Sequence, residues 1–142
     1  MKENTIMIQQ TEFTMPQYKR GYHLITDIIQ KQITSLPEKG ILNIFIQHTS
    51  AALTINENFD HTVRKDFETF FNKLIPDGSS YFTHDSEGDD DMPAHLKASL
   101  LGQSLTIPIT NNGLNLGTWQ GIYLCEFRNN GGRRRIVITI YS

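Results

Sequence analysis

The segment HDSEGDDDMPAH, residues 84–95, contains residue types that bind metal ions: an imidazole at each end and five carboxylates between them. A third histidine, His48, follows the apolar stretch 41–46. Imidazoles contributed by a strand end, a loop and a helix can surround one ion and leave a coordination position open for water or substrate. The spacing of His48, His84 and His95 matches no regular metal motif. The alternative is therefore scattered histidines that are hydrogen-bonded to loop carboxylates.

The carboxylates of Glu87, Asp89, Asp90 and Asp91 have three interpretations. Clustered oxygen ligands suit Mg²⁺, which often bridges to a substrate phosphate. Carboxylates also orient histidine ligands by hydrogen bonding, and acidic turns are often simply solvated. Asp91 is in addition a suitable N-cap for a helix over 91–102, whose free N–H groups would favour an anion. The segment predicts a divalent metal ion, Zn or Mg, and a small phosphorylated metabolite as ligands.

A second unusual stretch, GTWQG at 117–121, places glycines on both sides of Trp119 and Gln120. Trp119 could stack on a ligand ring while Gln120 hydrogen-bonds to it. Alternatively, Trp119 is a core aromatic and the glycines mark bends in a sheet, which composition alone favours. Further along, Glu126 and Arg128 share one face of a predicted strand, which indicates a buried ion pair or an anion contact.

The elements that must position these residues follow from hydrophobic periodicity. Helical spacing of apolar residues predicts two longer helices over 21–40 and 59–76, the second capped by Asp60, and a short helix over 91–102. Asn112-Gly113 is a strong turn signal between strands. The remaining apolar stretches predict strands over 5–15, 41–58 (two strands), 104–109, 114–128 and 134–142. This order indicates an α+β fold with a mostly antiparallel sheet.

Length and composition limit the function classes. The 142 residues predict a single domain, 1–142, and the net charge of −2 gives no electrostatic reason to expect nucleic acid or an anionic membrane as partner. No apolar run approaches the ~20 residues that span a bilayer, and the first residues do not resemble a signal peptide. The lone Cys125 fits a reducing interior, so the sequence predicts a cytoplasmic protein.

Several catalytic motifs are absent from the sequence. It has no G-x-x-x-x-G-K-[ST], G-x-G-x-x-G, G-x-S-x-G, C-x-x-C or H-E-x-x-H. Their absence removes P-loop nucleotide hydrolysis, Rossmann cofactors, standard esterases and zinc ribbons from consideration.

Four segments carry a resemblance to a known family: 48–58 (HTSAALTINEN), 87–95 (EGDDDMPAH), 104–109 (SLTIPI) and 116–128 (LGTWQGIYLCEFR). They are similar to the YjbQ family, also called secondary thiamine-phosphate synthase, in the same order over essentially the whole chain. The resemblance implies an α+β two-sheet sandwich that assembles as a homotrimer with packed sheets around its threefold axis. It also implies a weak side activity that couples a pyrimidine pyrophosphate to a thiazole phosphate.

The matching positions suggest roles for particular residues. The positions are His48, Thr49, Ser50, Asn56, Asn58, Asp90, Met92, Pro93, His95, Trp119, Gln120 and Arg128, with His84 just upstream of the second motif. We expect one pocket in which the catalytic residues are His48, Asp90 and Arg128, and the metal ligands are His48, His84 and His95. Its ligand-binding residues would be Ser50, Asn56, Asn58, Trp119 and Gln120.

One departure from the family pattern bears on the activity. The family usually carries Gly-Arg before the leucine that leads into the last motif, whereas Asn112-Gly113 precede Leu114 here. An arginine that holds a phosphate or a neighbouring subunit would thus be missing at 113. The alternatives to an enzyme are a non-catalytic trimeric protein that binds a metabolite or metal, and a trimer whose motifs serve assembly.

Overall fold

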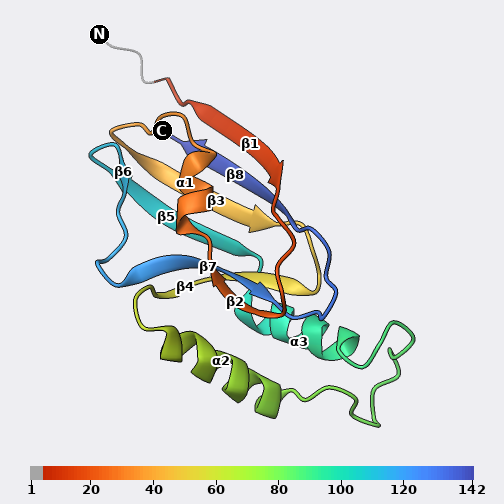
Figure 1. The fold of residues 1–142 in the computed structure, drawn as a ribbon. Helices are drawn as coiled ribbons and strands as arrows, with labels where there is room; N and C mark the ends of the chain where they lie inside the picture. The colour runs from red at the N-terminus through yellow and green to blue at the C-terminus, as the bar shows by residue number, and fades with distance from the viewer. Residues whose placement is uncertain (1–4) are drawn as a thin grey trace.

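The computed structural model describes residues 5–142, which form two β-sheets and three helices (Figure 1). The strands are β1 (Ile8–Thr14), β2 (Gly21–Leu24), β3 (Lys39–Ile46), β4 (Ala51–Glu57), β5 (Ser104–Thr110), β6 (Gly113–Leu114), β7 (Gln120–Glu126) and β8 (Arg135–Tyr141). The helices are α1 (Thr26–Lys31), α2 (His61–Leu74) and α3 (Asp91–Leu101). This arrangement confirms the α+β class. None of the described helices is long and apolar enough to cross a membrane.

The two sheets are antiparallel and pack face to face. One has the order β1-β8-β3-β5-β6 and the other the order β2-β7-β4. Alternating apolar side chains of the larger sheet, such as Leu42, Ile44 and Ile138, point inward and are buried. They meet Leu53 and Leu124 of the smaller sheet, which produces the main core that alternation of a half-buried strand predicts.

The smaller sheet is covered on its other face by helices, so its central strand β7 is buried on both sides. Ile122 and Leu124 of β7 belong to the main core, whereas Tyr123 and Cys125 belong to a second core. Ala94 and Ala98 of α3 contribute small side chains to that second core, and α2 lies beside α3 over the same sheet (Figure 1). Cys125 is buried, and this burial raises the pKa of its thiol.

The predicted helix over 21–40 is wrong for most of its length. Residues Gly21–Leu24 form β2, which pairs with β7 so that His23 lies opposite Leu124. Only Thr26–Lys31 are helical. The isoleucines do have helical spacing, but pairing with the buried strand overrides it for the first four residues, and β-branched Ile33 and Thr34 follow the helix end.

The other helices and turns agree with the sequence in outline and differ at their ends. Asp60 caps α2 as predicted, its side chain accepting from the Thr62 N–H at 2.9 Å. Asp91 does not cap α3: Asp90 occupies that position. The β5–β6 turn is formed by Asn111 and Asn112, both with positive φ, one residue before the predicted pair.

Candidate metal centre

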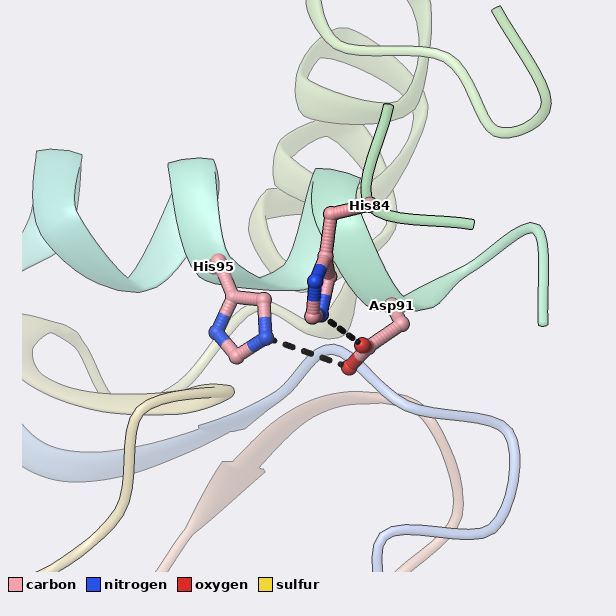
Figure 2. Close-up of side chains that lie close together, drawn as sticks. All are labelled: His84, Asp91 and His95. Atoms are coloured by element: carbon pink, nitrogen blue, oxygen red, sulfur yellow. Dashed lines mark hydrogen bonds and ion pairs between the residues drawn. The ribbon is translucent and has the colours of Figure 1, made fainter. Parts of the chain in front are cut away.

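His84, Asp91 and His95 lie together at the start of α3 (Figure 2). Asp91 and His95 are four residues apart on the helix and therefore share a face, while His84 comes from the loop that precedes it. The Asp91 Oδ2 atom is 2.7 Å from His84 Nε2, and Asp91 Oδ1 is 3.3 Å from His95 Nε2. One ligand atom of each residue lies within 4.8 Å of the others, so this group could hold a metal ion.

The Asp91 carboxylate is buried although it is charged, and it is fixed from a second direction. The Arg128 Nη1 atom donates to Asp91 Oδ1 at 2.7 Å. Arg128 follows the end of β7 and also donates from Nε to Asp90 at 2.9 Å and from Nη2 to the Glu87 carbonyl at 2.9 Å. The guanidinium therefore ties the acidic loop to the sheet and leaves Asp91 with its two oxygens facing the imidazoles.

The hydrogen bond of His95 to the backbone determines which ring nitrogen faces Asp91. His95 Nδ1 lies 3.0 Å from the carbonyl oxygen of Thr49, in the turn between β3 and β4. A carbonyl only accepts, so Nδ1 must carry a proton. In a neutral ring, Nε2 then presents its lone pair to the carboxylate oxygen of Asp91. Two acceptors face each other stably only if the ring is also protonated at Nε2 or if a cation lies between them.

Asp90 is held ionised beside this group. Burial alone would raise the pKa of its carboxyl, but hydrogen bonds from the Asn129 N–H and from Arg128 outweigh burial and lower the pKa. Burial alone would lower the pKa of the Arg128 guanidinium. Its hydrogen bond to Asp90 and the charges of the neighbouring carboxylates together outweigh this effect, so the pKa is raised overall. The two groups thus form a stable ion pair, and Arg128 already has carboxylate partners before any ligand binds.

His48 does not join the other two histidines. Its Nε2 accepts from the Arg135 N–H at 2.8 Å, and its Nδ1 faces the Arg134 guanidinium. Burial, and next the charge of Arg134, lower the pKa of His48. The Nε2 lone pair accepts a hydrogen bond from the first residue of β8, so it is not available to a metal ion. In this arrangement the ring has a structural role.

Ser50 lies beside His48, but its hydroxyl is hydrogen-bonded to the arginine of a buried ion pair. The Arg134 guanidinium donates to the Ser50 hydroxyl at 3.0 Å and, through Nε, to Glu126 Oε1 at 2.7 Å. The buried ion pair expected for Glu126 therefore exists, but its partner is Arg134, whereas Arg128 binds the acidic loop.

The remaining expected pocket residues lie at the other end of the smaller sheet. One end of the β4–β7 ladder is the pairing of Glu57 with Gln120, and beside it lie Asn56, Asn58 and Trp119. The other end is the pairing of Ala51 with Glu126, which is next to the histidines. At ~3.3 Å per residue the two ends are roughly 20 Å apart. Trp119 is 60% exposed, which contradicts its interpretation as a core aromatic. Within one chain the structure does not assemble a single pocket from all these residues.

Sequence reasoning counted Asp91 among the loop carboxylates that suit Mg²⁺ but did not place it in one ligand set with the histidines, because helix capping already explained it. A usable signal was present: within a predicted helix that begins near 91, Asp91 and His95 have the i, i+4 spacing that places two side chains together. The Thr49 carbonyl had no sequence signal, since any residue type supplies one.

Comparisons with known proteins agree on one family. The sequence pattern described as "UPF0047 protein YjbQ-like" matches residues 11–142. The chain is similar to the UPF0047 protein YjbQ of Escherichia coli O157:H7, with 48% identity over 136 residues that cover 94% of this chain and 98% of that protein. It is 50% identical over 136 residues to the protein of the same name from Salmonella typhimurium, with the same two coverages.

Solved structures show the same fold. A YbjQ-like protein of unknown function from Sulfolobus solfataricus P2 has a TM-score of 0.83 at 26% identity, covering 97% of this chain and 99% of that one. An uncharacterized conserved protein of the YjbQ/UPF0047 family from Clostridium acetobutylicum has a TM-score of 0.77 at 33% identity, covering 92% and 98%.

Proposed function

Because the chain belongs to the YjbQ-like UPF0047 family, we propose that His84, Asp91 and His95 bind a divalent metal ion that receives a phosphorylated metabolite. The three side chains converge from α3 and the loop before it, as Figure 2 shows. Three protein ligands leave at least one coordination position for water or for a substrate oxygen.

The contact between His95 and Thr49 carries this proposal. It commits Nδ1 as a donor to a backbone carbonyl and directs the Nε2 lone pair at a buried carboxylate. Histidines that bind metals are oriented in this way, with the second nitrogen donating to a carbonyl or carboxylate. A cation between His95 Nε2 and Asp91 Oδ1 would replace the repulsion between two lone pairs by two attractive interactions.

The donor set favours zinc or a similar transition ion over magnesium. Mg²⁺ prefers oxygen ligands and keeps several waters, whereas imidazole suits Zn²⁺ and other late first-row ions. Two imidazoles and one carboxylate therefore match Zn²⁺ better than Mg²⁺, whereas the carboxylates of the acidic loop alone would favour Mg²⁺.

The charge balance supports a phosphorylated ligand only when the ion is present. Asp90 and Asp91 outweigh Arg128, and Asp85, Glu87 and Asp89 add further negative charge nearby. A divalent ion would change the net charge of Asp90, Asp91 and Arg128 together from negative to positive, so a phosphate could approach them. For the thiamine-phosphate synthase activity of the resemblance, the ion would supply electrostatic stabilisation of departing pyrophosphate. Arg128 would hold Asp91 in place and offer its remaining N–H groups to that anion.

Metal content tests the proposal directly. We expect untagged protein, dialysed against Zn²⁺ and then against buffer, to retain about one equivalent, measured by elemental analysis and calorimetric titration. His95→Ala and Asp91→Asn should each lower the affinity at least about 100-fold, because each removes a ligand. His61→Ala, an exposed histidine at the start of α2, is the matched control and should bind as the wild type does.

His48→Ala separates this ligand set from the three-histidine set expected from the sequence. It should keep its metal, since His48 lies outside the group. Stoichiometric zinc lost in His48→Ala but retained in His95→Ala would contradict the proposal, and so would a folded wild type that retains no metal. Turnover with the two phosphorylated thiamine precursors then decides between an enzyme and a metabolite-binding protein: the enzyme predicts that Asp91→Asn loses turnover while its circular dichroism is unchanged.

We also propose that the protein is a homotrimer, as the family resemblance implies. The outer face of the five-stranded sheet supports self-association, because no described helix covers it and large apolar side chains are exposed on it. Ile8, Tyr141 and Ile41 form one row across β1, β8 and β3, and Phe45 lies in a parallel row. Apolar surface of this kind is typical of subunit interfaces.

A further inference from the structure

A cavity lies far from the metal centre, at the opposite end of the smaller sheet. It has a volume of about 540 Å³ and is open to solvent on one side. Its lining comes from the β2–α1 junction and from the ends of β4 and β7: Leu24, Thr26, Asp27, Ile28, Asn58 and Gln120. Ligand pockets typically have volumes in the range of ~300–1,000 Å³.

Two amide side chains in the lining have unused hydrogen-bonding groups. The Gln120 Oε1 atom accepts from the Gly117 N–H at 2.8 Å, so the amide is oriented with its NH₂ group outward. Asn58 donates from Nδ2 to the Thr118 and Gln120 carbonyls, both at 3.1 Å, and its Oδ1 remains as an acceptor. Across residues 5–142, no protein group pairs with Gln120 Nε2 or Asn58 Oδ1. The pocket therefore offers a fixed donor and a fixed acceptor.

The pocket wall is closely packed behind these groups. A Cβ atom at Gly121 would lie 2.6 Å from Leu24 Cδ2 and 2.9 Å from Asn58 Cβ, so only glycine fits there. The second glycine of the GTWQG segment therefore lets β2 and the end of β4 approach β7. Thr26 is held from the same side, because its hydroxyl accepts from the Ile122 N–H at 2.9 Å. The lining is thus fixed by the sheet before any ligand binds.

Two exposed aromatic residues adjoin the lining. Trp119 directly precedes Gln120 and is 60% exposed, and Phe59 directly follows Asn58 and is 78% exposed. Their ring centroids are 5.9 Å apart with an edge-on geometry, and the Asn58 N–H donates to the Trp119 carbonyl. Rings held apart from the core in this way can stack on a planar ligand such as a nucleobase.

We propose that this pocket binds a nucleoside-like ligand, in which a planar heterocycle is joined to a hydroxylated sugar without a phosphate. The heterocycle would stack on Trp119 and accept from Gln120 Nε2. The sugar hydroxyls would donate to the Asp27 carboxylate and to Asn58 Oδ1, as acidic side chains do with ribose hydroxyls in dinucleotide-binding proteins. Leu24 and Ile28 supply the apolar floor.

The charge of the lining disfavours a phosphate in this pocket. Among the lining residues that the structure describes, Asp27 alone is charged, so an anionic group would approach a carboxylate. The proposal is independent of the metal centre, which lies at the other end of β4 and β7.

Fluorescence titration tests the proposal, since Trp119 is the only tryptophan of the chain and reports on this pocket alone. We expect adenosine, guanosine, cytidine or uridine to quench it saturably, and the matching nucleoside monophosphate to bind more weakly. Gln120→Glu keeps the oxygen that Gly117 needs and removes the free donor, and it should weaken nucleoside binding ~3- to 10-fold. Asp27→Asn should reduce the preference for nucleoside over monophosphate.

Removal of metal with a chelator should leave nucleoside binding unchanged, so that failure of the metal centre and failure of this pocket can be told apart. Two results would overturn the proposal. One is the absence of saturable quenching by all four nucleosides up to their solubility limits. The other is quenching of equal strength in the wild type and in both Gln120→Glu and Asp27→Asn, which would indicate collisional contact with an exposed ring.

Discussion

At the scale of single residues, Asp91 connects three charged or titratable groups through one buried carboxylate. Its Oδ1 faces Arg128 and His95, and its Oδ2 faces His84. Arg128 neutralises the carboxylate enough to keep it buried, while the imidazole side stays partly exposed. A metal ion could therefore bind on the imidazole side of the carboxylate while Arg128 holds its other side, without a change in the fold.

Lys97, two residues beyond His95 on α3, is a buried cation with few partners. It is 1% exposed, its ammonium donates to Asn72 Oδ1 at 2.6 Å, and it lies 5.8 Å from the centre of the Phe127 ring. Arg20 donates to the same Asn72 oxygen at 3.0 Å. Burial, and next the charge of Arg20, lower the pKa of Lys97 from 10.5 to about 8.

This lowered pKa predicts how stability depends on pH. Between pH 8 and 10.5 the unfolded lysine keeps a proton that the folded one has lost, so folding becomes more favourable as pH rises across this window. Below pH 8 the full cost of burying the charge remains. Lys97→Met should therefore stabilise the protein at pH 7 by roughly 1–3 kcal/mol, and by much less at pH 10. Urea denaturation at the two pH values measures both differences.

Lys65→Met is the matched control, because Lys65 is an exposed lysine of α2. Its effect should be small and the same at both pH values. A Lys97→Met protein that is less stable than the wild type at pH 7, with no change in that difference by pH 10, would contradict the account.

The residue scale also shows what the sequence could and could not predict. His84 and His95 were found because residue type and short sequence separation are visible in the chain. Their relation to Asp91 depended on where α3 begins, which differs by one residue from the expected cap. Trp119 was misassigned because composition alone favours a core position for a tryptophan between glycines. The tight turn from Gly117 to Gln120, which places its ring outward, cannot be read from composition.

At the scale of elements, the segment between β7 and β8 is held by a buried ion pair. Glu126 ends β7 and is fully buried, and Arg134, just before β8, is almost fully buried. Arg134 also bonds to Ser50 at the start of β4. This one pair therefore joins both sheets at the end of the sandwich where the metal centre lies.

Breaking this pair should cost far more than breaking an exposed one. Glu126→Gln leaves the Arg134 charge buried without a countercharge, and we expect a loss of ~3–5 kcal/mol in the free energy of unfolding. Replacing both partners, Glu126→Leu with Arg134→Met, should recover most of that loss because no buried charge remains. Equilibrium denaturation followed by circular dichroism measures all three proteins.

The surface pair of Glu12 and Arg135 provides the comparison. Both side chains are about half exposed, so Glu12→Gln should cost less than ~1 kcal/mol. Equal losses for Glu12→Gln and Glu126→Gln, or a double variant no more stable than Glu126→Gln alone, would show that the buried pair does not act in this way.

The prediction of elements succeeded where a segment's pattern agreed with its neighbours. The strands β3 and β8 were predicted from their apolar stretches, and the helix α2 from its helical period and the Asp60 cap, because each of these patterns points to one structure. The segment 21–40 failed because its isoleucines have helical spacing while its first residues pair with β7, a contact about 100 positions away in the chain. Local pattern contains no information about such a partner.

At the scale of the whole molecule, the exposed face of the five-stranded sheet is the surface on which the proposed trimer depends. Phe45→Arg places a charge on that face, where Phe45 is 44% exposed. If the face lies between subunits, the variant should sediment as a monomer while its circular dichroism remains that of the wild type. Analytical ultracentrifugation of both proteins makes the measurement.

Phe70→Arg is the corresponding control, because Phe70 is an exposed phenylalanine of α2 at 58% exposure. It should keep the wild-type mass. A wild type that sediments as a monomer, or Phe70→Arg dissociating while Phe45→Arg does not, would rule out this face as the interface.

The strand order has a consequence for how the protein is made. The central strand of the smaller sheet is β7 and the strand that joins β1 to β3 is β8, and both follow every other strand along the chain. A ribosome therefore releases the outer strands of each sheet before the strand that unites them. Until β7 and β8 emerge, β1, β2 and β4 have none of their strand partners, so neither sheet can close during synthesis. The nascent chain must keep several apolar strands unpaired until β7 and β8 are synthesised, which makes translation speed and chaperone access matter most for its earliest strands.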